Sequence, residues 1–467
     1  MSNESRRNPS EAERPAAVLL GVQLQGVSDQ AFDSSLTELE RLGKTLGLRI
    51  VGRVTQKRRG RGGATVVGEG KLKELAEYTD GPGFVPSYSP AGSREEPEEP
   101  EEDEDDEATD LADEESEEDD EPSTPRAVTV LVDQDLSPTQ MRNLEQASGA
   151  EVLDRSMVIL SIFQRHARTR EAKIQVEIAR LLYMAPRLRE ANAGSERQRG
   201  GVGGKGAGES ALELGRRATR DRIAELRRNL VVVQRESDTQ RSRRNSGAAR
   251  TVALVGYTNA GKSRWMRALT NDEMYVANQL FATLDTTVRI LVPETRPRVL
   301  VSDTVGFIKD LPHDLVASFR STLEEARDAD LHLHVIDAAD PACGDQYEVT
   351  RRVLGEIEAD AHDRLLLLNK SDLLNDTQRS ELLERFPEAV LVSATSPDDV
   401  KRVHALIQDF FERDMDEEDF VIPYDQQAKV SMLHERCRVL EERYEEDGTH
   451  IRVRGSAALL GGLRREL

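Results

Sequence analysis

Short apolar runs alternate with longer segments of helical spacing in the second half of the chain. The runs are TVALVGY (251–257), RVLVSDTV (298–305), LHLHVIDA (331–338), DRLLLLNKSD (363–372) and AVLVSAT (389–395). Because successive positions are apolar, both faces of each strand are expected to be buried, as in a parallel sheet covered by helices. Residues 249–415 are therefore predicted to form one α/β domain.

The first part of the chain shows a similar alternation. Strands are predicted at 16–25 and 49–56, and Leu36, Leu39 and Leu42 repeat at helical spacing between them. A basic glycine-rich loop, a short strand at ATVV and a helix follow, and the strand pattern resumes at AVTVLVDQDLSP. Residues 15–155 are predicted to form a second α/β domain, which residues 81–126 interrupt.

Two long helical patterns lie between these domains, in residues 156–248. The first is RTREAKIQVEIARLLYMAPRL, and the second begins at Ala211 and carries a heptad-like seam. The seam consists of Leu212, Thr219, Ile223, Leu226, Leu230 and Val233. Because a glycine-rich loop joins the two patterns, we predict an antiparallel helical hairpin.

The last segment, residues 416–467, shows both the helical and the strand spacing of apolar residues. It contains DFVIPYD, a helix predicted around KVSMLHERCRVLEERYEE (429–446) and a strand at THIRVRG. A small C-terminal α/β domain is expected.

Charge is distributed unevenly along the chain, whose formal net charge is −23. Residues 95–121 hold 20 acidic residues and no Lys or Arg. Like charges with few apolar side chains cannot offset the entropy of ordering, so residues 81–126 are predicted to be a disordered acidic insert. Residues 127–250 carry +8 and residues 251–467 carry −15. The excess of Arg over Lys, with abundant acidic residues, resembles proteins of salt-loving archaea.

The basic middle part contains candidate RNA contacts. Arg197, Arg199 and Lys205 lie among seven glycines in residues 194–208. Cationic side chains neutralise phosphates, and glycines allow backbone amides to approach them. RNA contact is therefore favoured over the alternative, a mobile loop between solvated helices.

Composition also narrows the class of protein. No apolar run approaches the roughly 18–20 residues that a membrane span needs, and the first residues lack the apolar core of a secretion signal. A cytoplasmic monomer is expected. Cys343 and Cys437 match no metal-binding spacing, so both are expected to be buried or idle thiols.

The stretch GYTNAGKS fits the phosphate-loop pattern G-x-x-x-x-G-K-S, with an apolar strand before it and a helix-forming segment after it. Lys262 can reach the outer phosphates of a nucleotide, and the Ser263 hydroxyl can bind Mg²⁺. The flanks disfavour a glycine turn without function. The predicted nucleotide contacts here are Gly256, Tyr257, Thr258, Asn259, Ala260, Gly261, Lys262 and Ser263.

A second motif, DTVGF, follows about forty residues later and comprises Asp303, Thr304, Val305, Gly306 and Phe307. Asp303 can hold Mg²⁺ through a water molecule, and the Gly306 amide can sense a terminal phosphate. At the position of Phe307, nucleotide-hydrolysing proteins with such a loop often have a glutamine that orients the attacking water. A phenyl ring cannot do this, so the residue that orients water stays unknown and slow intrinsic hydrolysis is expected.

Two further motifs indicate which base is bound. NKSD supplies Asn369, Lys370, Ser371 and Asp372, and VSAT supplies Ser393, Ala394 and Thr395. The Asp372 carboxylate can accept hydrogen bonds from N1–H and the 2-amino group of guanine, which adenine lacks. Because an unsatisfied buried polar group costs roughly 1–3 kcal/mol, guanine is expected to be preferred.

Together these residues resemble translation-factor-related P-loop GTPases, and the fuller pattern resembles the HflX family of ribosome-associated GTPases. The motifs that carry this resemblance are GYTNAGKS, QLFATLDTTVR, DTVGF, NKSD, VSAT, ATVVGEGKLKEL, DLSPTQMRNLE and RTREAKIQVEIARL. The resemblance covers nearly the whole chain except the acidic insert.

The resemblance implies Mg²⁺-dependent hydrolysis of GTP to GDP, linked to the large ribosomal subunit and its rRNA, and in some members the separation of ribosomes. It implies a switch segment formed by Phe281, Ala282, Thr283, Leu284 and Asp285, with Thr283 on Mg²⁺. The residues alone would not choose Thr283 over Thr286 or Thr287. Asn259 matches an asparagine that resembles a K⁺ ligand in related GTPases, and it could instead brace the loop.

Two alternatives to a ribosome-remodelling GTPase come from other classes. In one, the nucleotide only stabilises the fold and the hairpin tethers RNA or a protein. In the other, the chain is an ATP-driven RNA remodeller, which Asn369 and Asp372 disfavour.

Overall fold

The computed structural model describes residues 14–60, 63–85, 126–196, 211–245, 249–271, 280–281, 287–296, 298–309, 320–413 and 415–466. The chain divides into two compact units, residues 1–155 and 156–467. Several predicted features lie outside the described residues: residues 86–125 of the acidic insert, Arg197, Arg199, Lys205, Ala282, Thr283, Leu284 and Asp285.

The first unit contains a four-stranded parallel sheet in the order β2-β1-β3-β4. Its elements are β1 (Ala16–Leu24), α1 (Asp29–Thr45), β2 (Arg49–Arg58), α2 (Glu69–Thr79), β3 (Thr129–Val132), α3 (Pro138–Ser148) and β4 (Glu151–Asp154). Leu36, Leu39 and Leu42 of α1 are buried as their spacing predicts. The predicted strand over residues 64–67 is not formed. Val66 has φ +70°, so the backbone bends there while the Val66 side chain stays buried.

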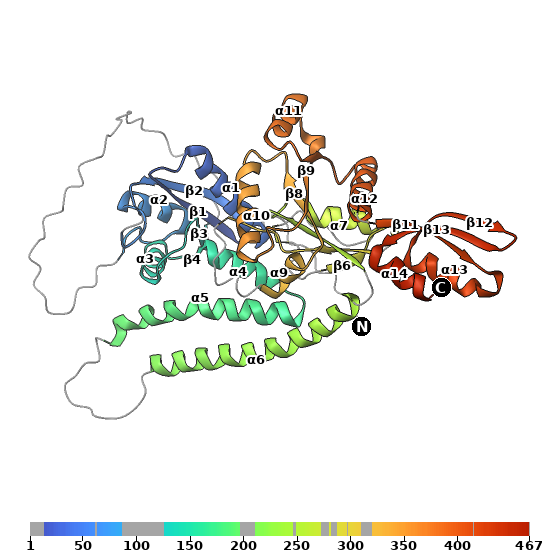
Figure 1. Cartoon of the computed structure of the whole chain (residues 1–467). Coiled ribbons are helices and arrows are strands. Elements are labelled where there is room, and N and C mark those ends of the chain that lie inside the picture. The colour runs from blue at the N-terminus through green and yellow to red at the C-terminus, as the bar shows by residue number, and fades with distance from the viewer. Residues whose placement is uncertain are drawn as a thin grey trace, which may run out of the picture. The chain divides into compact units, whose positions relative to one another are not determined.

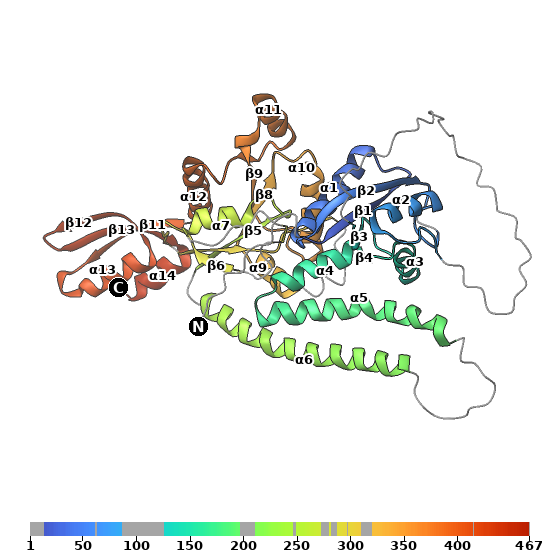
Figure 2. The same ribbon diagram turned by 180° about the vertical axis from the view of Figure 1, so that it is seen from behind.

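The second unit begins with helix α4 (Arg155–His166), whose first residue, Arg155, still belongs to the first unit. Two long helices follow, α5 (Arg170–Glu196) and α6 (Ala211–Asn245). Both views in Figures 1 and 2 show α5 and α6 side by side. A cluster of Ile174, Ile178, Leu226 and Val233 packs between them, with Leu230 at its edge. Leu226, Leu230 and Val233 of the predicted seam therefore lie at the contact between the two helices.

The centre of the second unit is a six-stranded sheet in the order β10-β9-β8-β5-β7-β6. The strands are β5 (Arg250–Gly256), β6 (Thr287–Ile290), β7 (Val299–Asp303), β8 (Leu331–Asp337), β9 (Arg364–Asn369) and β10 (Val390–Leu391). All neighbours pair in parallel except β6 with β7. The apolar runs predicted the five parallel strands. They missed β6, which lies at the sheet edge and is partly exposed.

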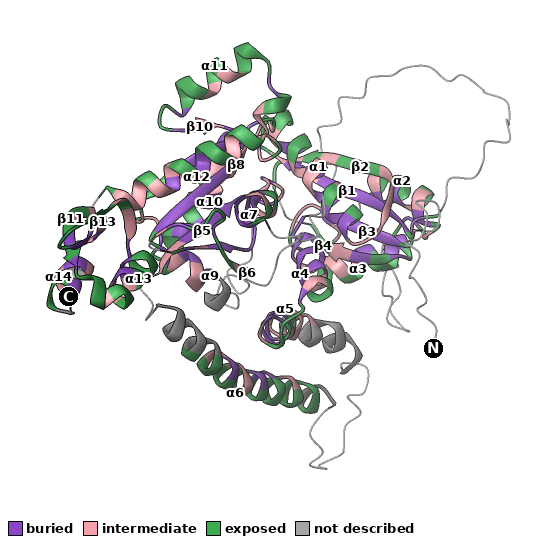
Figure 3. Cartoon of the chain, turned by 90° about the vertical axis from the view of Figure 1, so that its right-hand side faces the viewer, coloured by how far each residue is buried: buried purple, intermediate pink, exposed green. Residues whose placement is uncertain are grey.

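Helices cover both faces of this sheet, and Figure 3 shows β5 and β8 in the colour of buried residues. The helices are α7 (Lys262–Thr270), α9 (Arg320–Arg327), α10 (Cys343–Glu356), α11 (Asp376–Arg385) and α12 (Pro397–Glu412). Val252 and Leu254 of β5 pack in the cluster with residues of α7 and α12, whereas Ala253 and Val255 pack with residues of α9 and α10. A strand with core on both sides needs the continuous apolar run that the sequence shows.

The C-terminal part forms an antiparallel sheet in the order β11-β13-β12 with two helices. Its elements are β11 (Met415–Ile422), α13 (Gln427–Arg436), β12 (Arg438–Glu445), β13 (Gly448–Ser456) and α14 (Ala457–Glu466). The helix predicted over residues 429–446 is wrong in its second half, because α13 ends at Arg436 and β12 follows. The side chains of β12 favour helices, but pairing with β13 and packing of Val439 on the core outweigh that preference.

Within the described residues, no helix combines the length and apolar character needed to cross a membrane. Both cysteines are free and buried, as expected. Burial raises the pKa of the Cys437 thiol to about 11, so this thiol stays protonated at neutral pH.

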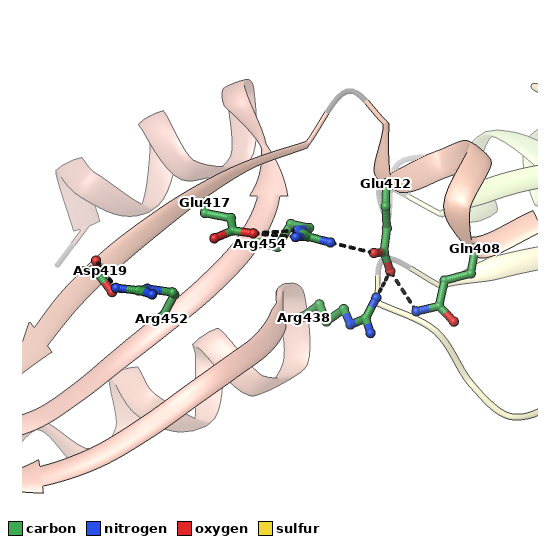
Figure 4. Close-up of polar contacts among 7 residues, drawn as sticks. All are labelled: Gln408, Glu412, Glu417, Asp419, Arg438, Arg452 and Arg454. Carbon is green, nitrogen blue, oxygen red and sulfur yellow. Dashed lines mark hydrogen bonds and ion pairs between the residues drawn. The ribbon is translucent and has the colours of Figure 1, made fainter. Parts of the chain in front are cut away.

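Glu412, the last residue of α12, joins the six-stranded sheet region to the C-terminal sheet (Figure 4). Its carboxylate accepts hydrogen bonds from Gln408 Nε2 at 2.7 Å, Arg454 at 2.9 Å and Arg438. Its side chain is 10% exposed. Burial raises the pKa of Glu412, but the hydrogen bonds from Gln408, Arg438 and Arg454 outweigh burial and hold this pKa below its usual value.

We expect Glu412→Gln to lower the free energy of unfolding at pH 7 by about 1–3 kcal/mol, because two arginines lose their shared carboxylate. A lowered pKa means that Glu412 stabilises the fold above its usual pKa and loses this effect as pH falls through the lowered value. The difference from wild type should therefore shrink below about pH 4. Urea unfolding at the two pH values measures it.

Asp419→Asn is the matched control, because the pair of Asp419 with Arg452 on β13 is exposed on both sides. This variant should unfold like the wild type. Equal losses in the two variants, or a difference for Glu412→Gln that persists at low pH, would contradict the role given to Glu412.

Candidate nucleotide-binding site

The loop between β5 and α7 is held in a conformation that requires glycine. Gly256 has φ +147° and Gly261 has φ +102°, while Asn259 has φ +60°. A Cβ at Gly256 would lie 2.2 Å from the Val335 carbonyl oxygen of β8. A Cβ at Gly261 would lie 2.3 Å from Asn369 Nδ2. The two glycines therefore let the loop lie directly on the carboxyl ends of two neighbouring strands.

Lys262 lies inside this loop. Its ammonium donates hydrogen bonds to the carbonyl oxygens of Gly256 at 3.0 Å and Tyr257 at 2.8 Å. Burial lowers the pKa of Lys262 to about 8, against an opposing effect of the Asp303 carboxylate. The side chain therefore places a positive charge at the centre of the loop, where phosphate oxygens would be bound.

Ser263 and Asp303 meet beside the lysine. The Ser263 hydroxyl, in the first turn of α7, donates to Asp303 Oδ2 at 2.7 Å. Asp303 ends β7 and is fully buried. A hydroxyl and a carboxylate are hard oxygen ligands of the kind that Mg²⁺ prefers, so this pair fits a Mg²⁺ site next to the phosphates.

Residues 303–307 run along the phosphate loop. Thr258 N–H donates to the Phe307 carbonyl oxygen at 2.7 Å, and Phe307 N–H donates to that of Gly256 at 3.2 Å. A Cβ at Gly306 would lie 2.9 Å from Lys262 Nζ and 2.9 Å from Thr258 Cα. Gly306 thus brings its backbone against the loop, close to where a terminal phosphate would be sensed.

The Phe307 side chain lies in the core instead of the site. It is 2% exposed and packs in the cluster that contains Val255 and Leu323. This placement agrees with the expectation that Phe307 does not orient a water molecule.

Asn369 connects the phosphate loop to the segment after β10. Its Nδ2 donates to the Ala260 carbonyl oxygen at 2.7 Å, and its Oδ1 accepts from Ala394 N–H at 3.1 Å. Asn369 is 2% exposed. The sequence predicted Asn369 as a base contact, and the structure shows that it holds two loops together.

The remaining predicted base contacts form a small polar network. Ser393 Oγ donates to Asp372 Oδ1 at 2.5 Å and is 2.7 Å from Thr395 Oγ1. Lys370, at φ +63°, forms an ion pair of 2.6 Å with Asp337. The network thus brings the NKSD and VSAT motifs together at one edge of the sheet.

Sequence reasoning missed two carboxylates of this region. Asp337 ends β8 and orients Lys370, and Asp399 of α12 accepts from Ser393 N–H at 2.9 Å. Asp337 could have been found from the sequence, because it is a carboxylate at the end of the apolar run LHLHVIDA and the next apolar run along the chain ends in the NKSD motif. Asp399 follows the VSAT motif in a first helical turn and has no comparable signal.

A phosphate loop between a buried strand and a helix, a serine and aspartate pair, and a base network on the adjoining strand ends define a P-loop GTPase. Three family descriptions match the chain: "GTP-binding GTPase N-terminal" at 33–83 and 113–164, "GTP-binding GTPase Middle Region" at 166–244 and "50S ribosome-binding GTPase" at 251–370. The chain belongs to the HflX GTPase family and is a GTPase.

The similarity to individual relatives extends along the whole chain. A GTPase HflX from Gluconacetobacter diazotrophicus is 51% identical over 453 residues, which are 97% of this chain and 98% of that protein. One from Caldanaerobacter subterraneus is 33% identical over 97% of this chain and 94% of that protein. A GDP complex of a GTP-binding protein from Sulfolobus solfataricus is 18% identical, with a TM-score of 0.43, over 84% of this chain and 99% of that one.

The relatives confirm the family inferred from the motifs. The predicted α/β fold with a GTPase domain is confirmed by the observed sheet and by the family description that matches residues 251–370. The haloarchaeal resemblance of the composition, the cytoplasmic location and the monomeric state stay predictions.

Proposed function

We propose that this GTPase binds the large ribosomal subunit and couples GTP binding and hydrolysis to ribosome remodelling or subunit dissociation. One observation supports the proposal most strongly. The four nucleotide motifs GYTNAGKS, DTVGF, NKSD and VSAT lie together at the strand ends, and the same unit contains the long basic helical pair of α5 and α6. The family description "50S ribosome-binding GTPase" supports the choice of partner.

The residues of the site have separate roles in this proposal. Lys262 stabilises charge on the outer phosphates, Ser263 and Asp303 hold Mg²⁺, and Gly306 approaches the terminal phosphate. Mg²⁺ neutralises the charge that develops on the phosphate oxygens. Thr283 is proposed as the further Mg²⁺ contact from the switch segment.

Hydrolysis needs a group that orients water, and the Phe307 ring is buried in the core. We infer that the bound partner or a rearranged switch segment supplies that group, so that turnover depends on the ribosome. GTP hydrolysis would then release the ordered switches and change the engagement of the helical pair.

The helical pair is the proposed route to rRNA. Arg216, Arg220, Arg227 and Arg228 are exposed on α6. Phosphate contacts by Arg197, Arg199 and Lys205 would extend this basic surface, and such contacts weaken with added salt.

Guanine selection is tested by Asp372→Asn. Because the carboxylate accepts from two donors of guanine, we expect at least a tenfold loss of affinity for GDP and GTP. The new amide offers a donor to the 2-oxo group of xanthine, so affinity for xanthosine diphosphate should rise. Calorimetry with GDP, XDP and ADP measures this, and Asp376→Asn, an exposed change nearby, should bind GDP like the wild type. Unchanged GDP affinity in Asp372→Asn would contradict the assignment.

A potassium ion is proposed as a second cofactor, at Asn259. If K⁺ stabilises the transition state, turnover should be several-fold faster in KCl than in NaCl at equal ionic strength. Asn259→Gly removes the side chain but tolerates φ +60°, so it should remove the difference without unfolding the loop. Equal rates in the two salts for the wild type would exclude the ion.

The ribosome proposal is tested by sedimentation of purified ribosomes with the protein and GTP, a non-hydrolysable analogue or GDP. We expect more protein in the ribosomal fraction with the analogue than with GDP, and release of subunits if the protein separates them. Equal amounts in the GDP and analogue states would contradict coupling. In a folded Lys262→Ala variant, an unchanged effect on ribosomes would favour the alternative, a tethering module that the nucleotide only stabilises.

A further inference from the structure

Phe281, the first residue of the predicted switch segment, is attached to helix α4. The rings of Phe281 and Phe163 meet edge to face, with centroids 4.6 Å apart and an angle of 80° between planes. His166 Nδ1 lies 2.8 Å from the Phe281 carbonyl oxygen. Phe163 and Phe281 are 1% and 2% exposed. The contact is therefore a buried one that combines ring packing with a hydrogen bond.

The chemistry of His166 fixes the direction of this hydrogen bond. A carbonyl oxygen can only accept, so Nδ1 carries the proton and donates it. Burial is the main cause that lowers the pKa of His166, with the cations of Arg165 and Arg168 acting in the same direction. The neutral imidazole with a proton on Nδ1 is thus the form that holds Phe281 at neutral pH.

The backbone at Phe281 needs this support. Its φ is +55°, in the left-handed region, where a bulky side chain is strained. Such a conformation persists only when the surrounding structure imposes it. Ring packing by Phe163 and hydrogen bonding by His166 act on the side chain and the backbone of the same residue, and together they impose the conformation.

The contact links the nucleotide site to the helical pair. Phe281 is two residues before Thr283 in the chain, and β6 begins at Thr287. At the other end, α4 finishes at His166 and α5 begins at Arg170. Gln164 of α4 also accepts a hydrogen bond of 2.9 Å from Arg180 of α5. Helix α4 therefore touches the start of the switch segment and the base of the helical pair.

We propose that Phe163 and His166 are positioning residues for GTP hydrolysis, which fix the switch segment at Phe281 and make α4 the connection between the nucleotide site and the helical pair. The link to the helical pair rests on the proposed ribosome role, whereas the effect on hydrolysis rests only on the proposed Mg²⁺ contact of Thr283. Fixing one end of the segment reduces the conformational entropy that is lost when its Mg²⁺ contact forms.

The test compares His166→Ala, Phe163→Leu and His166→Asn in the full chain without ribosomes. We expect the first two to lower single-turnover GTP hydrolysis by roughly three- to tenfold, the range given by loss of one hydrogen bond of ordinary net strength or of one aromatic pair. They should also raise the Mg²⁺ concentration needed for half-maximal hydrolysis, while GDP affinity stays within about twofold. His166→Asn keeps a side-chain N–H donor close to the position of Nδ1 and should recover most of the rate.

Gln164→Ala is the control for hydrolysis and should match the wild type there, since Gln164 is exposed and contacts Arg180 of α5 instead of Phe281. Unfolded variants are recognised by loss of GDP binding, and in that case His166→Asn and Phe163→Leu carry the test. Hydrolysis and Mg²⁺ dependence that match the wild type, or hydrolysis that becomes faster, would overturn the assignment. Ribosome sedimentation of the same variants distinguishes failure of the ribosome proposal from failure of the α4 proposal. If sedimentation of the wild type does not depend on the nucleotide, the proposed function fails. The hydrolysis rates then still decide whether Phe163 and His166 position the switch segment.

Discussion

The close approach of the phosphate loop to the ends of β8 and β9 is the constraint on which the site depends. Gly256 and Gly261 leave no room for a Cβ beside the Val335 carbonyl oxygen and the Asn369 side chain. This approach brings Lys262 under the loop carbonyls and puts Ser263 within a hydrogen bond of Asp303. The alternation of buried strands and covering helices in the second unit supplies the rigid edge against which the loop rests.

The same sheet explains how distant motifs meet. Parallel strands end at the same edge, so Gly256, Asp303, Asp337 and Asn369, each the last residue of its strand, lie at one side of the sheet. Polar residues at these ends can contact one another without any strand leaving the core. The chain therefore builds a charged site on an apolar frame, and the cost of burying the charges is offset by pairs such as Lys370 with Asp337.

The sequence was most informative where local pattern and tertiary environment agree. Buried parallel strands need continuous apolar runs, and these runs predicted β5 and β7 to β10. The motif GYTNAGKS likewise predicted a loop between a strand and a helix, which the structure shows between β5 and α7. The failures were at positions decided by tertiary pairing. Edge strand β6 has no long apolar run, and β12 consists of helix-favouring residues that pair with β13. The backbone bends at Val66, and valine is not a residue type from which a turn is predicted.

In the nucleotide site, the sequence identified residue types better than their partners. Asn369 was recognised by its motif, but its two hydrogen bonds depend on the separation of three loops in space. The contact of Phe281 with Phe163 and His166 joins residues more than one hundred positions apart, which no local spacing could indicate. Contacts of this kind depend on the arrangement of whole elements, so the three-dimensional structure was needed to find them.

The two bonds of Asn369 have a consequence for engineering the nucleotide preference of this enzyme. One side-chain amide bonds the phosphate loop at the Ala260 carbonyl and the VSAT motif at the Ala394 N–H, so a replacement there disturbs both loops together. Asp372 is bonded only within the base network by the contacts described above. Redesign for an orthogonal nucleotide should therefore vary the carboxylate and leave the asparagine in place, because the hydrogen bond of Asp372 to Ser393 does not involve the phosphate loop.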